Sequence, residues 1–394
     1  MTEQRAAWPQ LFRFENGLPV QTAEDWSSRA AELRKLYETQ MYGTWREGEQ
    51  VSYTLSDEGA MMISFFGNIP AEGAKNLTVK VSANGRETSW SLPVFMPDSA
   101  VTPMPEGGYP VVISMHGLPS MQAALSRGYA VIPNNSSLVA SDDTKHIGSF
   151  YDLYPYEAAP ESQTGVLMAW AWGCSKILDA IFNGLGEELG LNPNLAIVTG
   201  VSRFGKATAV CGAFDSRFRM VAPSCSGAGG LALYRYTSEG KCYDFSTKGA
   251  PAEYTYGQNE PLSCLQSDGE RGWFNDAFLN FSSPDDIPLE QYELAALSAA
   301  PDRCLFLIAS CISEDWVNAP SMWECYLEAS KLFDFLGMPE RIACNFHKEG
   351  HAVLEEDFEK MLPYFERVIC GRDVAVDFDE LHTSVFALPG NRKE

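Results

Sequence analysis

The chain has 394 residues, 45% of them hydrophobic, which is enough to bury the core of one large α/β domain. Its 52 acidic and 29 basic residues give a net charge of -23, which argues against nucleic acid as a partner, because phosphate binding requires a basic surface. No run of about 18 apolar residues is present, so we expect neither a membrane-spanning helix nor a membrane partner.

The N-terminus has no apolar signal core, and the ten cysteines form no CxxC pair. We therefore expect a cytoplasmic protein, or a secreted or periplasmic one from which the signal has been trimmed. Neither a metal nor another cofactor is expected, since ligand pairs at metal-site spacing are missing. Cysteines such as Cys304 and Cys344 lie inside apolar runs, which favours buried free thiols over disulfides.

The first part of the chain predicts a helix, antiparallel strands and then the first buried strands. A helical pattern covers residues 22–42 and ends at Gly43. Short alternating runs between residues 51 and 96 indicate antiparallel strands. Apolar runs predict strands at 109–117 and 129–133, and a long apolar helix covers 165–185.

The second part predicts strands that alternate with helices. Strands are expected at 195–199, 219–223, 304–309 and 342–346, with helices at 207–214 and 321–336 and a long loop region at 236–300. Antiparallel strands followed by alternating strands and helices are typical of an α/β-hydrolase fold, a three-layer α-β-α sandwich with a mostly parallel central sheet. We expect one catalytic domain over residues 1–394, with residues 22–100 integrated into it.

The turn after strand 195–199 reads Gly200-Val201-Ser202-Arg203-Phe204-Gly205-Lys206. A serine on a tight strand-to-helix turn, with glycines nearby, is the geometry of a nucleophile elbow. The usual pattern has glycine two residues after the serine, where Phe204 stands here, so the match is partial. Two cations next to a candidate nucleophile, in a chain this acidic, suggest a site for an anionic substrate.

The base and the acid of a serine hydrolase follow the nucleophile in this fold. Of the five histidines, His351 lies just past the last predicted strand, where the base is expected. His347 closes that strand, where its side chain is packed, and His382 lies beyond the last regular helix. The loop after strand 304–309 offers two acids, of which we favour Asp315 over Glu314.

The two cations have distinct predicted roles. Arg203 offers its main-chain N–H, and its guanidinium, to a developing oxyanion. Lys206 lies one helical turn beyond Ser202, on the same face, from which it can reach a substrate hydroxyl or carboxyl group. The alternatives are a structural salt bridge for Arg203 and a solvated lysine at the start of a helix.

With these residues the chain resembles the glucuronoyl esterases, carbohydrate esterase family fifteen, over most of its length. The nucleophile motif of that family is Gly-Cys-Ser-Arg-x-Gly-Lys. Further similar segments are Leu167-Met168-Ala169-Trp170-Ala171-Trp172-Gly173, Ser226-Gly227-Ala228-Gly229-Gly230, Trp273-Phe274-Asn275-Asp276-Ala277-Phe278 and Gly350-His351.

The resemblance implies a serine esterase that cleaves esters of (4-O-methyl-)glucuronic acid with alcohols, as in lignin–carbohydrate linkages and glucuronoxylan. It implies Ser202 as nucleophile, His351 as base and Arg203 as oxyanion donor. It also implies contacts of Lys206, Glu270 and Trp316 with the sugar, since a tryptophan face covers the C–H face of a sugar ring.

Two departures from the family pattern affect this interpretation. Many members carry the catalytic glutamate where this chain has Cys225, so the acid must come from elsewhere, in agreement with Asp315 or Glu314. The fungal pattern also has a disulfide between positions that are Val201 and Ala352 here.

The expected substrate is a small-molecule or oligosaccharide glucuronate ester, and the expected enzyme is a monomer. The alternatives are a general carbohydrate or small-ester esterase, such as a deacetylase, and a catalytically impaired uronate-binding relative. The cations Arg203 and Lys206 argue against the first, and the retained Ser202 and His351 against the second.

Overall fold

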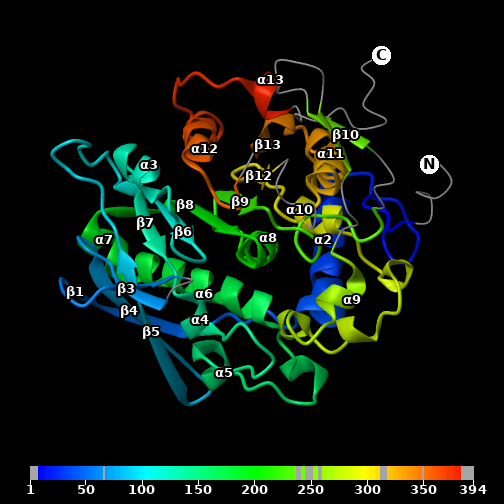
Figure 1. The fold of residues 1–394 in the computed structure, drawn as a ribbon, viewed down its shortest axis with the longest axis horizontal. Coiled ribbons are helices and arrows are strands. Elements are labelled where there is room, and N and C mark those ends of the chain that lie inside the picture. Colours follow the sequence, from blue (N-terminus) through cyan, green and yellow to red (C-terminus); the bar gives the residue numbers. More distant parts are fainter. Residues whose placement is uncertain are drawn as a thin grey trace.

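The computed structural model describes residues 8–64, 67–236, 241–244, 252–255, 260–310, 317–347 and 350–382. At the centre of this described part lies a six-stranded sheet whose neighbouring strands are all parallel (Figure 1). In spatial order its strands are β13 (Ile342–His347), β12 (Cys304–Ser310), β9 (Met220–Ser224), β8 (Leu191–Val201), β6 (Tyr109–Ser114) and β7 (Ala130–Pro133). Their apolar runs are buried on both faces, as expected for a sheet covered by helices on each side.

Two layers of helices enclose this sheet. On one face α3 (Met121–Ser126) packs against α12 (Glu355–Val368). The other face is covered by α6 (Val166–Ala180), α8 (Arg203–Phe214) and α11 (Ala319–Phe335). The three-layer α/β-hydrolase architecture with a parallel central sheet is therefore confirmed.

The predicted antiparallel strands form a second sheet of β1 (Gln50–Ser56), β4 (Lys75–Ala83) and β5 (Arg86–Val94). Phe95 and Val131 exchange main-chain hydrogen bonds of 2.9 Å, which join the end of β5 to the edge strand β7. This sheet also contacts α6. Because α6 is thereby covered on two sides, almost all of its side chains are buried, and its sequence is largely apolar. The organisation of residues 1–394 as one domain stays a prediction.

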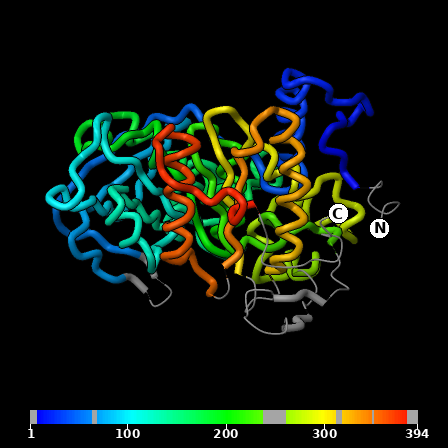
Figure 2. The backbone as a smooth tube through the Cα atoms, turned by 90° about the horizontal axis from the view of Figure 1, so that it is seen from above, coloured from blue at the N-terminus to red at the C-terminus, as the bar shows by residue number. Residues whose placement is uncertain are grey.

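The remaining elements are short, apart from the N-terminal helix α2 (Ala23–Tyr37), which continues as the π-helical turn η1 (Glu38–Tyr42) up to Gly43. They are β2 (Met61–Ser64), β3 (Gly67–Pro70), α4 (Ser136–Val139), α5 (Ser149–Leu153), η2 (Pro160–Ser162), η3 (Ile181–Leu185), α7 (Gly186–Leu189), η7 (Pro339–Arg341) and α13 (Phe378–Leu381). Figure 2 shows residues 50–135 at one end of the molecule and α11 toward the other.

Residues 236–300, predicted as a long loop, contain several short elements in their described parts. They are β10 (Lys241–Asp244), β11 (Ala252–Thr255), α9 (Leu262–Leu265), η4 (Arg271–Trp273), η5 (Phe278–Asn280), η6 (Pro284–Asp286) and α10 (Gln291–Ala296). A six-residue helix such as α10 is too short to show a helical period, and its side chains are buried all round.

Eight cysteines are free thiols, in agreement with the expectation. Cys174, Cys211, Cys225, Cys304, Cys325 and Cys344 are buried thiols, and Cys264 and Cys370 are partly exposed. Within the described ranges, the helices are all too short or too polar to cross a lipid bilayer.

Candidate active site

Ser202 connects β8 to α8 and has a strained backbone, with φ 62° and ψ -128°. A positive φ is rare for a residue with a side chain, and such strain persists where the surrounding structure enforces it. The main-chain N–H of Ser202 donates to the carbonyl oxygen of Ser224 at the end of β9, over 2.9 Å. The backbone is that of the predicted nucleophile elbow, at the carboxyl edge of the sheet.

The glycine of this elbow stands three residues after the serine because α8 passes close to β9. A Cβ atom at Gly205 would lie 2.3 Å from the carbonyl oxygen of Ser224, so no larger residue fits there. At the position where the usual pattern has glycine, the ring of Phe204 packs between His116 and Trp170, with centroids 4.8 and 4.7 Å away. The partial match to the general motif thus has a packing cause.

The loop that carries His351 folds back from β13 over the same edge of the sheet. Ser224 Oγ donates to the carbonyl oxygen of Ala352 over 3.2 Å, and Ser120 Oγ donates to that of Val353. Ser224 therefore binds Ser202 through its carbonyl and the neighbour of His351 through its hydroxyl. The structure thus brings Ser202 and the exposed His351 to the same edge of the sheet, where Ser224 holds the segments of both.

His116 is a neighbour of this pair that the sequence reasoning did not select. It follows β6, is stacked on Phe204, and has a buried Nδ1 without a hydrogen-bond partner among the described residues. Burial, and to a smaller extent the charge of His351, lower the pKa of His116 to about 4. His116 is therefore neutral near pH 7. The one feature of the sequence that could have indicated His116 is its position at the end of the predicted strand 109–117, next to Gly117.

Two of the other histidines, His347 and His382, take structural positions. His347 is buried at the end of β13, with Nε2 3.3 Å from the carbonyl oxygen of Ala352, and His382 pairs through Nδ1 with the hydroxyl of Tyr326 at 2.6 Å. These contacts agree with the choice of His351 as the candidate base.

Arg203 is the first residue of α8, so its main-chain N–H has no acceptor inside the helix. Its Nη1 donates to Asp142 Oδ2 over 2.6 Å, and its guanidinium lies 5.2 Å from the ring centroid of Trp273. The side chain is 41% exposed. The predicted oxyanion donor thus lies directly beside Ser202, and the structural salt bridge weighed as its alternative is present as well.

Lys206 is almost fully buried, and its ammonium has an acceptor for each of its three N–H bonds. These are the carbonyl oxygens of Ser226 and Ala228, at 2.8 and 2.7 Å, and Glu260 Oε2 at 2.7 Å. Lys206 is therefore not the solvated lysine of the alternative reading. Contact with a sugar hydroxyl stays a prediction, and it requires the sugar to share or replace one of these acceptors.

Glu270 lies just before η4, and its Oε2 is buried without a partner among the described residues. Burial raises the pKa of Glu270, and the charge of Glu260 raises it further, against the lowering effect of Lys206. An unpaired buried carboxylate oxygen is costly unless a ligand or water binds it, which favours a binding role for this side chain.

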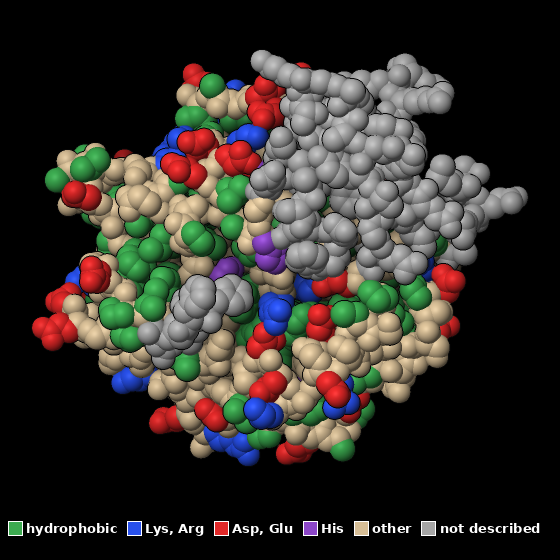
Figure 3. Space-filling model, in the orientation of Figure 1, with side chains coloured by type: hydrophobic (Ala, Val, Ile, Leu, Met, Phe, Trp, Pro, Cys, Tyr) green, Lys and Arg blue, Asp and Glu red, His purple; other side chains and the backbone are tan. Residues whose placement is uncertain are grey.

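Three predicted residues, Glu314, Asp315 and Trp316, lie outside the described residues. Cys225, which replaces the family's glutamate, is buried at the end of β9 with φ 46°. On the face of the molecule that Figure 3 draws, histidine side chains lie in the middle, next to basic and acidic side chains.

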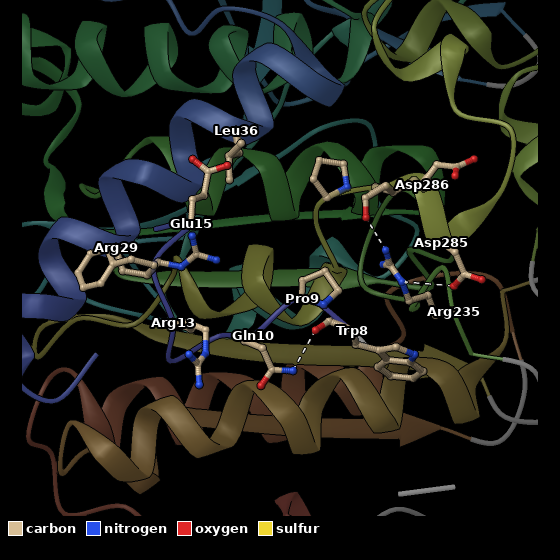
Figure 4. A pocket seen from close by; sticks show the side chains of 13 residues that line it. Trp8, Pro9, Gln10, Arg13, Glu15, Arg29, Leu36, Arg235, Asp285 and Asp286 are labelled. Atoms are coloured by element: carbon tan, nitrogen blue, oxygen red, sulfur yellow. Dashed lines mark hydrogen bonds and ion pairs between the residues drawn. The ribbon is translucent and has the colours of Figure 1, made fainter. Parts of the chain in front are cut away.

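A separate hollow of about 350 Å³ lies between the N-terminal segment, α2 and η6, and contains none of the predicted site residues (Figure 4). Its arginines are already engaged, Arg29 with Glu293 at 2.9 Å and Arg235 with Glu290 at 3.2 Å. A third arginine of the lining, Arg13, donates through Nη1 to the carbonyl oxygen of Gly17 over 2.8 Å.

A strained serine at the carboxyl edge of a parallel sheet, with a histidine loop folded back toward it, is the arrangement of an α/β-hydrolase, and the role of Ser202 as its nucleophile stays a prediction. The family model described as glucuronyl esterase, fungi, matches residues 79–337. The chain belongs to the glucuronoyl esterase family of carboxylic ester hydrolases.

Individual relatives agree with this assignment. A multidomain esterase of Ruminococcus flavefaciens is 47% identical over 390 residues, which is 98% of this chain but 49% of that protein, so the chain spans about half the length of that relative. A 4-O-methyl-glucuronoyl methylesterase of Hypocrea jecorina is 30% identical over 336 residues, 84% of this chain and 63% of the relative. The solved structure of a family 15 glucuronoyl esterase from Caldicellulosiruptor kristjansonii has a TM-score of 0.80 at 35% identity, covering 97% of this chain and 95% of that one.

Proposed function

We propose that this chain hydrolyses esters between (4-O-methyl-)glucuronic acid and an alcohol through an acyl-enzyme on Ser202. The observation that carries the proposal is the elbow, in which the strained Ser202 and the loop of His351 are both held by Ser224. The identity of the acyl group is inferred from the family, since two relatives are 4-O-methyl-glucuronoyl methylesterases.

In the proposed mechanism Ser202 Oγ attacks the C6 carbonyl carbon while His351 takes the serine proton. The main-chain N–H of Arg203 and its guanidinium stabilise the negative charge that develops on the carbonyl oxygen. When the tetrahedral intermediate collapses, the C6–O bond to the alcohol breaks and His351 returns the proton to the leaving oxygen. A water molecule, deprotonated by His351, then attacks the acyl-enzyme; the bond between C6 and Ser202 Oγ breaks, His351 passes its proton to Ser202 Oγ, and glucuronate is released.

The remaining roles are part of the same proposal. Asp315, or Glu314 in its place, orients His351 and stabilises its protonated form. Lys206, Glu270 and Trp316 bind the sugar. Support for Glu270 comes from its buried unpaired oxygen and raised pKa, which suit it to exchange hydrogen bonds with a sugar hydroxyl.

The test is hydrolysis of benzyl glucuronate beside p-nitrophenyl acetate by the wild type and by Ser202→Ala, Asp315→Asn and Glu314→Gln. We expect cleavage of the glucuronate ester, a loss of at least about a thousandfold in kcat for Ser202→Ala, and a larger loss for Asp315→Asn than for Glu314→Gln. Hydrolysis of the acetate alone would instead establish a general small-ester esterase, and no hydrolysis of either ester would contradict the proposal.

A further inference from the structure

We propose that Asp142 is a positioning residue that fixes the Arg203 guanidinium and the Trp273 indole in their working orientation beside Ser202. This inference rests on the proposed function, in which Arg203 stabilises the oxyanion. Asp142 lies in the loop between α4 and α5, and neither its own sequence context nor the family resemblance pointed to it.

Three contacts among Asp142, Arg203 and Trp273 form a closed triangle. Asp142 Oδ2 accepts from Arg203 Nη1 at 2.6 Å, and its other oxygen, Oδ1, accepts from Trp273 Nε1 at 2.7 Å. The third side is the guanidinium of Arg203 over the Trp273 ring, 5.2 Å from the centroid. A planar guanidinium that is bound through one nitrogen and also lies over an aromatic face has lost most of its freedom to rotate.

Two of the three segments that carry this triangle, the loop of Asp142 and the turn of Trp273, are held against each other. Main-chain Ser141 N–H donates to the carbonyl oxygen of Ile147 over 2.8 Å, which closes the loop on itself. The turn η4 lies directly on this loop, because a Cβ atom at Gly272 would come within 2.5 Å of the carbonyl oxygen of Asp143. Asp142 is therefore presented to Arg203 by a closed loop that is packed against the turn of Trp273.

The exposure of the pair argues for positioning rather than for stability. The side chains of Arg203 and Asp142 are 41% and 28% exposed, and ion pairs at such exposure add little to the free energy of unfolding. Only Nη1 of the Arg203 guanidinium has a hydrogen bond among the described residues. The remaining N–H groups are left for the oxyanion, and Asp142 decides where they point.

The experiment is a double-mutant cycle on benzyl glucuronate hydrolysis with Asp142→Asn, Arg203→Gln and the combined variant. We expect Asp142→Asn to lower kcat about tenfold, with KM changed less than threefold. In the Arg203→Gln background the same substitution should change kcat less than twofold, because its effect passes through the guanidinium. Asp142→Glu, which keeps the charge and both acceptors, should recover part of the lost kcat, and Trp273→Phe should lose about threefold.

The matched control is Asp276→Asn. Asp276 also joins two segments, accepting from the Tyr156 hydroxyl at 2.8 Å and from Gln163 Nε2 at 2.9 Å, but no described contact links it to Arg203. We expect its kcat to stay within twofold of the wild type. An equal loss for Asp142→Asn in both backgrounds, or an equal loss for Asp276→Asn, would overturn the inference.

Failure of the inference is distinguishable from failure of the proposed function. A wild type that cleaves the glucuronate ester while Asp142→Asn keeps full kcat leaves the function standing and removes the positioning role. A wild type that cleaves neither ester overturns both. If Asp142→Asn does not fold, as judged by thermal melting, the cycle is run with Asp142→Glu, for which coupling to Arg203 is still required.

Discussion

At the scale of single residues, each cation beside the nucleophile is balanced by a carboxylate. Arg203 pairs with Asp142, and Lys206 pairs with Glu260. The sequence alone suggested a site for an anionic substrate. Because both cations are paired, however, they do not form a site of net positive charge. This balance suits an ester, which is neutral until it is cleaved, and it leaves the transient oxyanion as the charge that Arg203 meets.

His116 provides a prediction for the pH dependence of stability. Its pKa is about 4 in the folded protein and about 6.5 in an unfolded chain, so folding favours the neutral ring. The contribution to stability is complete above pH 6.5 and is lost as the pH falls through 6.5 toward 4, by about 2 kcal/mol at pH 5. Measured by urea unfolding, His116→Phe should lose about 2 kcal/mol less than the wild type between pH 7.5 and pH 5. Equal losses in both proteins would show that His116 titrates normally in the folded state.

At the scale of elements, the position of His351 depends on how its loop is tied to neighbouring strands. Ser224 Oγ provides one tie, to Ala352. We expect Ser224→Ala to lower kcat on benzyl glucuronate about fivefold, with KM nearly unchanged, because the substitution loosens the base but leaves the sugar contacts in place.

Thr199→Val is the matched control for this prediction. Thr199 Oγ1 donates to the carbonyl oxygen of Ala222 over 2.7 Å, which is likewise a hydroxyl-to-carbonyl bond but joins two strands instead of a strand and the histidine loop. Both variants should lose about 1 kcal/mol of unfolding free energy, but only Ser224→Ala should lose kcat. A similar fall in kcat for Thr199→Val would mean that general loosening of the sheet, rather than the loop tie, limits the reaction.

The parts of this site differ in how far the sequence could predict them. The parallel strands and the elbow at Ser202 were predictable, because buried strands are continuous apolar runs and the turn residues are adjacent in sequence. Asp142 and Glu260 were not, since they lie 61 and 54 residues from the cations they bind and no local pattern connects them. The tie through Ser224 was equally hidden, because it depends on β9 standing between β8 and the loop after β13.

At the scale of the whole molecule, the dominant property is the net charge of -23. Glucuronoxylan carries free uronate groups besides its esters, so the enzyme and the polymer repel one another. The range of this repulsion falls from about 30 Å at 0.01 M salt to about 8 Å at 0.15 M. A small neutral ester such as benzyl glucuronate experiences almost none of it.

We therefore expect salt to separate polymeric from small substrates. Raising NaCl from 10 to 150 mM should increase kcat/KM several-fold on a glucuronoxylan-borne ester and change it less than 1.5-fold on benzyl glucuronate. The same polymer with its free uronates reduced to neutral sugars should lose the salt response, since it keeps the ester and the chain length but not the charge. If the neutral polymer responded to salt as strongly as the charged one, the repulsion argument would fail. A salt-independent preference for the small ester on both polymers would point instead to the shape of the site as the barrier to long chains.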